Sequence, residues 1–291
     1  MLFRSYLELR ESTLEGEPGA GLSHRSGGLV LFHVLELAAS GEPRGAVTVV
    51  HDAGEHGGRY LSLARVLAER GWSVALPDLR GHGRSEGERG HSQGIREVLR
   101  DLGDVQDHLA YRQPEAPRVL VGQGLGALYC LAFAAEHPDG VAALVLSAPL
   151  LQPRFARPEA PGGIFRMLKK IGPSSPGRIG WKPEDLTSDA SARRARADDE
   201  LVHDVITLRA IEQAEEAARV YLERGAGLPM PTLVLHGDRD PITSLDAARM
   251  LTGPRVELRT LPGLAHDLFH EVRSGETIAD VLDWLDAKLP R

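Results

Sequence analysis

The chain has 291 residues, of which 42% are hydrophobic and 26% charged, values ordinary for a globular protein with a large core. Its formal net charge of −7 argues against a general nucleic-acid binder, which normally presents a basic surface. No stretch approaches the roughly 18 consecutive apolar residues of a membrane-spanning helix.

Compartment is indicated by the first residues and by the single cysteine. Charges within residues 1–8 interrupt the apolar stretch that a signal peptide needs. Cys130 excludes an internal disulfide, suits a reducing compartment, and lies in a small-residue helix as a structural thiol. We expect a cytoplasmic protein.

The first 40 or so residues predict a β-hairpin. Residues 6–10 alternate with period two, a Gly/Pro/Ser-rich stretch follows, and residues 29–37 form the second strand. After this hairpin the pattern changes.

From residue 46 onward, short apolar runs alternate with segments of helical spacing. Strands are expected at 46–50, 72–76, 118–121 and 141–147, and helices at 60–70, 95–112 and 125–137. Continuous apolar runs indicate strands buried on both faces, and their alternation with helices indicates a parallel sheet covered on both sides. The predicted fold class is α/β.

The alternation stops at Pro149 and resumes near residue 230. The later elements are strands at 232–236 and 256–260 and helices at 245–251 and 277–289. We therefore predict a core made of residues 1–149 and 230–291, with residues 150–229 inserted as a Pro/Gly-rich and then helical segment without a buried strand. Such an insertion covers the usual ligand site of an open α/β sheet, so we interpret it as a lid.

Within the predicted lid, residues 163–171 carry an amphipathic pattern. Apolar side chains recur on one helical face, with basic residues beside them. This face either roofs the pocket or makes transient contact with a membrane or lipid aggregate.

Three turns at strand ends carry the chemical signal. The run around Gly122-Gln123-Gly124-Leu125-Gly126 has the form of the G-x-S-x-G nucleophile elbow, with Gly124 in place of serine. Asp240 follows the strand at 232–236, and His266 follows the last strand. α/β-hydrolases place nucleophile, acid and histidine in this order, the acid orienting the imidazole and the histidine moving the nucleophile's proton.

Two loops make the likeness specific. They read His51-Asp52-Ala53-Gly54-Glu55-His56-Gly57-Gly58-Arg59-Tyr60 and Asp78-Leu79-Arg80-Gly81-His82-Gly83-Arg84-Ser85. These loops resemble H-G-x-G-E-H-x-G-R-Y and D-x-R-G-H-G-x-S of the monoacylglycerol lipase and lysophospholipase branch of the α/β-hydrolases, of serine aminopeptidase S33 type. The likeness extends over nearly the whole chain and includes Asp198–His203 in the lid.

The resemblance implies an α/β-hydrolase fold that needs no cofactor and cleaves monoacylglycerols, lysophospholipids or similar esters. It implies that Asp240 and His266 are acid and base. It also implies that the backbone amides of Ala53 and Leu125 form the oxyanion hole, whose donors hold the developing negative charge.

Two departures from the family pattern lie in the site itself. Gly124 has no hydroxyl, so no acyl-enzyme forms there, and glycine relaxes the strained geometry of the turn. Asp52 replaces the glycine beside the oxyanion donor, and a carboxylate directed there would oppose an oxyanion. We therefore predict a pseudoenzyme, or a strongly impaired hydrolase, that keeps a pocket for an acyl ester or lipid.

Several alternatives remain open at this point. His266 could activate a water in the space vacated by the serine, or Asp52 could itself act as a carboxylate nucleophile. Ser85 or Ser147 could be a displaced nucleophile, although both suit turn or cap roles. An ordinary esterase would follow if the natural protein carries serine at position 124.

The sequence predicts no metal site. His51, His56 and His82 fall in loops that converge on the predicted site, but their spacing matches no known metal motif. The sequence does not indicate an oligomeric state or a protein partner.

Overall fold

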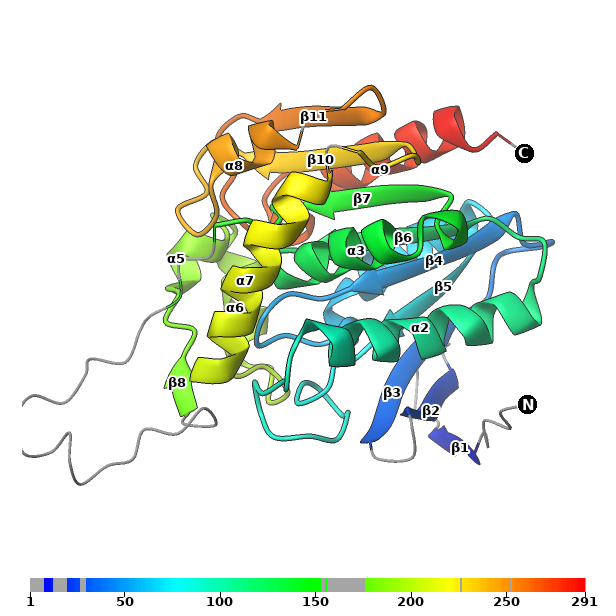
Figure 1. Cartoon of the computed structure of the whole chain (residues 1–291), viewed down its shortest axis with the longest axis horizontal. Helices are drawn as coiled ribbons and strands as arrows, with labels where there is room; N and C mark the ends of the chain where they lie inside the picture. Colours follow the sequence, from blue (N-terminus) through cyan, green and yellow to red (C-terminus); the bar gives the residue numbers. More distant parts are fainter. Residues whose placement is uncertain are drawn as a thin grey trace, which may run out of the picture.

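The computed structural model describes residues 8–12, 20–26, 30–152, 155, 176–225, 227–251 and 253–290. Its centre is a nine-stranded sheet in the order β1-β2-β3-β5-β4-β6-β7-β10-β11 (Figure 1). Neighbouring strands pair in parallel from β5 to β11 and antiparallel from β1 to β5. The strands are β1 (Glu8–Ser12), β2 (Ala20–Ser26), β3 (Val30–Leu37), β4 (Gly45–Val50), β5 (Trp72–Pro77), β6 (Arg118–Gln123), β7 (Ala143–Ser147), β10 (Thr232–Gly237) and β11 (Val256–Leu261).

Helices cover both faces of this sheet, and the predicted α/β class is confirmed. Buried side chains of α1 and α9 form one apolar core with the strands, and those of α2, α3 and α7 form the core on the opposite face. The helices are α1 (Leu61–Glu69), α2 (Ile95–Arg112), α3 (Leu125–Glu136), α5 (Pro183–Leu186), α6 (Ala190–Ala197), α7 (Leu208–Gly225), α8 (Leu245–Met250) and α9 (Ser274–Lys288), with short 3₁₀ turns at Gly57–Tyr60, Pro138–Gly140 and Leu268–His270.

The central strands and α3, the helix that follows Gly124, are apolar because they are surrounded by protein. Every residue of β4 and β7 is buried, and α3 buries Leu125–Ala134 on all sides. The first turn of α3 lies against β4, where a Cβ on Gly126 would be 2.3 Å from the carbonyl oxygen of Val50. Glycine at 126 permits this approach, which places the start of α3 beside the end of β4.

The N-terminal hairpin prediction is wrong in one respect: the segment has three strands. β2 lies within the Gly/Pro/Ser-rich stretch and pairs antiparallel with β3 from Ala20 opposite Glu36 to Ser26 opposite Val30. Its sequence, AGLSHRS, lacks the apolar alternation that identifies a half-buried strand. Backbone pairing with β3 supplies what the side-chain pattern does not show.

Between β7 and β10, the described residues 176–225 hold α5, α6, α7 and a second, two-stranded antiparallel sheet of β8 (Pro176–Arg178) and β9 (Val205–Thr207). The expectation of no buried strand here is wrong, because Ile206 and Thr207 of β9 are buried. β9 has only three residues, which are too few to show the alternating pattern of a strand in the sequence. α5 lies beyond the carboxyl ends of the central strands (Figure 1), whereas the amphipathic pattern at 163–171 falls outside the described residues.

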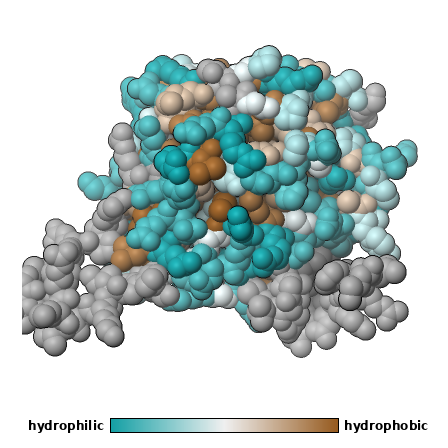
Figure 2. Space-filling model, viewed as in Figure 1, coloured by the Kyte–Doolittle hydropathy of each residue, from teal (hydrophilic) through white to brown (hydrophobic). Residues whose placement is uncertain are grey.

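The surface that carries α2 and α7 is mainly hydrophilic, with apolar side chains in small separate groups (Figure 2). Large exposed apolar side chains among the described residues are Tyr111, Met250 and Val272, which lie on different elements. No helix within the described ranges is long and apolar enough to cross a membrane.

Candidate active site

The turn between β6 and α3 places Gly124 at the carboxyl edge of the sheet. Its φ of +53° is in the region that favours glycine, and its N–H donates to the carbonyl of Ser147 on β7 at 2.9 Å. The next residue, Leu125, begins α3, so its N–H has no acceptor within the helix.

Asp240 and His266 meet at the same edge of the sheet. Asp240 Oδ2 lies 2.9 Å from His266 Nδ1 and accepts a bond from the Thr243 hydroxyl at 2.5 Å. Asp240 Oδ1 accepts the N–H groups of Ile242 and Thr243. The carboxylate is thus fixed by its own turn, and it holds the imidazole by Nδ1.

Asp52 occupies the other side of the same imidazole. Its Oδ2 lies 2.9 Å from His266 Nε2, and its Oδ1 accepts the N–H groups of Ala53 and Leu125, each at 2.7 Å. The two amides that the sequence assigns to an oxyanion hole therefore both donate to Asp52. The three site side chains form a line from Asp240 through His266 to Asp52.

His51 fixes the backbone that carries Asp52. Its Nδ1 donates to the carbonyl of Asp52 at 2.7 Å, and its Nε2 accepts the N–H of Leu79 at 2.9 Å. The ring is fully buried, which lowers its pKa despite the nearby carboxylate of Asp78. His51 is thereby a neutral structural residue that joins two loops.

Asp52 and Gly124 compete for one space. A Cβ on Gly124 would lie 2.1 Å from Asp52 Oδ1 and 2.3 Å from its Cγ, distances that no real pair of atoms adopts without displacement. The space beside Gly124, in which the alternative with activated water places that water, is filled by the Asp52 carboxylate.

The site favours a protonated His266. Burial alone would lower the pKa of His266, but Asp240 and Asp52 on either side raise it well above its usual value. Burial alone would raise the pKa of Asp240, but the charge of His266 and its hydrogen bonds lower it strongly. The position of the ring between Asp240 and Asp52 thus favours the imidazolium form of His266.

Residues from the 176–225 segment contact this line and the neighbouring loop, and they were not predicted as site residues. The Trp181 ring meets the His266 ring edge-on, with centroids 5.5 Å apart, and stacks on Phe155 at 5.6 Å. Arg196 on α6 binds the buried carboxylate of Glu55, and His56 Nε2 lies 2.8 Å from Asp199 Oδ2. The sequence offers no period or motif that would identify Trp181 or Arg196.

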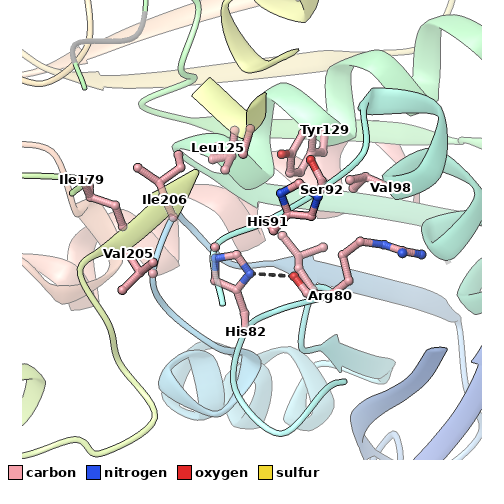
Figure 3. A pocket seen from close by; sticks show the side chains of 15 residues that line it. Arg80, His82, His91, Ser92, Val98, Leu125, Tyr129, Ile179, Val205 and Ile206 are labelled. Carbon is pink, nitrogen blue, oxygen red and sulfur yellow. Dashed lines mark hydrogen bonds between the residues drawn. The ribbon is translucent and has the colours of Figure 1, made fainter. Parts of the chain in front are cut away.

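A narrow cavity of about 20 Å³ lies beside Ala53 and Leu125 (Figure 3). Its walls are mainly apolar, with the buried hydroxyl of Tyr129 and the ring of His82 among them. His82 Nδ1 donates to the carbonyl of Arg80 at 3.0 Å, as drawn in Figure 3, and burial lowers the pKa of this ring well below its usual value.

The other candidate nucleophiles are buried within the described part of the chain. The Ser85 hydroxyl donates to the carbonyl of Asp78 at 2.6 Å and accepts the N–H of His33 at 2.9 Å. Ser147 is fully buried at the end of β7, where its carbonyl fixes Gly124. Cys130 is buried in α3, which raises the pKa of its thiol.

The fold and this edge of the sheet define the class of the protein. A glycine-rich strand-to-helix turn, an acid after β10 and a histidine after β11 are the arrangement of an α/β-hydrolase. A family model described as "Serine aminopeptidase, S33" matches residues 41–273. The chain belongs to that family.

Two relatives that cover most of the chain are named as monoacylglycerol lipases. The monoacylglycerol lipase of Mycolicibacterium smegmatis is 29% identical over 258 residues, which cover 85% of this chain and 90% of the relative. The monoglyceride lipase of Mus musculus is 29% identical over 261 residues, covering 81% and 83%.

Solved structures agree with this assignment of fold. The monoacylglycerol lipase of Paleococcus ferrophilus superimposes with a TM-score of 0.76 at 25% identity, over 88% of this chain and 99% of that one. A monoglyceride lipase variant from Saccharomyces cerevisiae gives a TM-score of 0.78 at 19% identity, over 98% and 96%.

Proposed function

We propose that this chain is a monoacylglycerol-lipase-like member of the family that has lost serine-type ester hydrolysis and keeps a site for a small acyl ester or lipid. The observation that carries the proposal is the Asp52 carboxylate, which binds the amides of Ala53 and Leu125 and the imidazole of His266 at once.

Two parts of the serine mechanism are missing for separate reasons. At the proposed nucleophile position, Gly124 offers no oxygen to attack an ester carbonyl. At the proposed oxyanion hole, both donors are 2.7 Å from an oxygen that is already negative. A tetrahedral intermediate would have to displace a buried carboxylate before it gained either hydrogen bond.

The alternative route through activated water is disfavoured by the state of His266. A general base must be unprotonated at the nitrogen that accepts the proton. Here Nε2 faces Asp52, and the two carboxylates raise the pKa of the imidazole well above its usual value. Both ring nitrogens of His266 therefore face a carboxyl side chain, and Asp52 fills the space beside Gly124.

The proposed ligand follows from the relatives and from the cavity. The relatives named above act on monoacylglycerols by their names, and the cavity beside Ala53 and Leu125 is lined mainly by apolar side chains. We interpret residues 150–229 as the lid over this site, with Trp181 as a wall above His266. Contact of its residues 163–171 with lipid aggregates is part of the same proposal.

A short-chain ester assay tests the proposed function. We expect hydrolysis of p-nitrophenyl butyrate by the wild-type chain at the level of the buffer, and the same level for His266→Ala. Hydrolysis that the wild type catalyses and that His266→Ala abolishes would show that the inherited base still works, and the proposal would be wrong.

A further inference from the structure

The last strand of the central sheet has a neighbour on one side only. Among the described strands β11 pairs with β10 alone, so its other side is an edge of the sheet (Figure 1). Every residue of β4 and β7 is buried, whereas no residue of β11 is. We propose that this edge is a dimer interface, at which a second copy of the chain adds its own β11 antiparallel to the first, about a two-fold axis at Leu258.

Hydrogen bonds at both ends of β11 show which of its backbone groups face the free side. The N–H of Thr232 donates to the carbonyl of Arg255 at 2.9 Å, and the N–H of Asp238 donates to the carbonyl of Leu261 at 3.2 Å. Successive residues of a strand direct their N–H and C=O groups to opposite sides. The odd-numbered residues therefore face β10, and the even-numbered residues of β11 face outward, where an edge strand can pair with another chain.

Two prolines limit the register in which two copies can pair. Pro254 and Pro262 have no N–H, and each lies four residues from Leu258. A two-fold axis at Val256 or at Thr260 would set Leu258 opposite one of these prolines, so the ladder would lose a donor. An axis at Leu258 sets the two prolines opposite each other, outside the strand, and every outward-facing residue of β11 then meets a residue with an N–H.

The charges of β11 exclude the two axes that lie between these positions. An axis at Glu257 would place that carboxylate opposite its own copy, and an axis at Arg259 would do the same with two guanidinium groups. Like charges directly opposite each other destabilise a sheet, whereas opposite charges stabilise it. With the axis at Leu258, Glu257 lies opposite the partner subunit's Arg259, and Arg259 lies opposite the partner subunit's Glu257.

Contacts within one chain already hold both charges beside this edge. Arg259 Nη2 lies 2.6 Å from Glu257 Oε1, and the two side chains are 32% and 41% exposed. Trp284 on α9 donates from Nε1 to Glu257 Oε2 at 3.1 Å, and Asp280 Oδ2 lies 3.6 Å from Arg259 Nη1. Pairing of two copies would join two such pairs into a group of alternating charges, accessible on the α9 side of the sheet.

The opposite side of β11 is apolar. Val256 and Leu258 are half-buried and pack against the core that α2, α3 and α7 form with the sheet. In the proposed register Val256 lies opposite the partner subunit's Thr260, and Leu258 lies opposite the partner subunit's Leu258. An added strand therefore covers apolar surface that a single copy leaves exposed.

Charge reversal tests the interface by sedimentation velocity. We expect the wild type to sediment as a dimer, and Glu257→Arg and Arg259→Glu each to lose the dimer, because like charges then face each other. The matched control is Glu216→Arg, which reverses a charge of an exposed ion pair on α7 and should leave the dimer intact. A monomeric wild type, or a dimer that survives both reversals at β11, would overturn the proposal.

A mixture of the two reversed variants tests the register itself. Each copy of Glu257→Arg carries two cations at this edge and each copy of Arg259→Glu carries two anions, so an equimolar mixture should recover a dimer that neither variant forms alone. A mixture that stays monomeric would contradict the register.

Amide hydrogen exchange of the wild type gives an answer that does not depend on any variant folding. The N–H groups of Leu258 and Thr260 face away from β10, so they should be protected from exchange only if a second strand pairs with them. Rapid exchange at both, with slow exchange along β10, would overturn the proposal. No measurement here involves ester hydrolysis, so failure of this inference and failure of the proposed function are distinct results.

Discussion

The carboxylate of Asp52 lies in the space that any side chain at Gly124 would enter, since a Cβ there would be 2.1 Å from Oδ1. The two residues are therefore coupled, although they lie on different loops. Asp52 requires glycine at 124, and a side chain at 124 requires Asp52 to move. The departures from the family pattern at these two positions describe a single change in the site.

Gly124→Ala should lower the free energy of unfolding by about 3 kcal/mol, from the strain of a positive φ together with overpacking. Gly263→Ala is a matched control, because Gly263 has φ +78° and no atom within 4 Å of an added Cβ. That control should cost about 1 kcal/mol, from φ alone. Urea denaturation measures both. Equal losses for the two variants would mean that Asp52 does not occupy the space beside Gly124.

The sequence predicts more of the fold than of the contacts within the site. The apolar runs of β4, β6 and β7 predict the parallel sheet because buried strands leave a continuous pattern. The order of Gly124, Asp240 and His266 predicts that they share one edge. The contact between Asp52 and His266 could not be predicted, since it joins loops 214 residues apart and depends on one rotamer.

The local sequence pattern also gives no prediction where strand pairing or side-chain packing alone determines the structure. β2 has no apolar alternation and is a strand because β3 offers it a partner. Trp181 covers His266 from a segment whose path over the sheet no sequence period encodes. These contacts required the three-dimensional structure.

Stability should depend on pH through His266. Its pKa is raised in the folded chain above the unfolded value of about 6.5. Its protonation therefore stabilises the fold fully below about pH 6.5, and this contribution is lost as pH rises through the folded pKa. Each unit of raised pKa corresponds to about 1.4 kcal/mol.

The measurement is the difference in unfolding free energy between wild type and His266→Gln from about pH 6 to pH 9. We expect this difference to shrink as pH rises. The comparison cancels groups common to both chains, including His82, whose lowered pKa acts with the opposite sign. A difference that grows with pH would mean that His266 is neutral in the folded chain.

The segment around α6 should be held to the core by Arg196. Its guanidinium binds Glu55, which is buried and also contacts Arg59 and the Tyr60 hydroxyl. Arg196→Ala leaves a buried carboxylate with one cation fewer, and should cost about 1–3 kcal/mol. Amide hydrogen exchange should accelerate over residues 190–207.

The control for that variant is Arg219→Ala, which breaks an exposed ion pair with Glu216 on α7. Such pairs contribute about 0–1 kcal/mol, so this change should be nearly neutral. If both variants exchange at the wild-type rate over 190–207, Arg196 does not anchor α6.

The central claim, that Asp52 closes the serine site, is tested most directly by ester hydrolysis across wild type, Gly124→Ser, Asp52→Gly and the double variant. Gly124→Ser alone should stay inactive, because Asp52 still holds both amides and His266. Asp52→Gly alone should also stay inactive, because Gly124 offers no nucleophile. The double variant should exceed either single variant by about 10³-fold or more, because loss of the serine from a complete triad costs up to about 10⁶-fold in kcat. Gly124→Ser hydrolysing the ester as fast as the double variant would contradict the account.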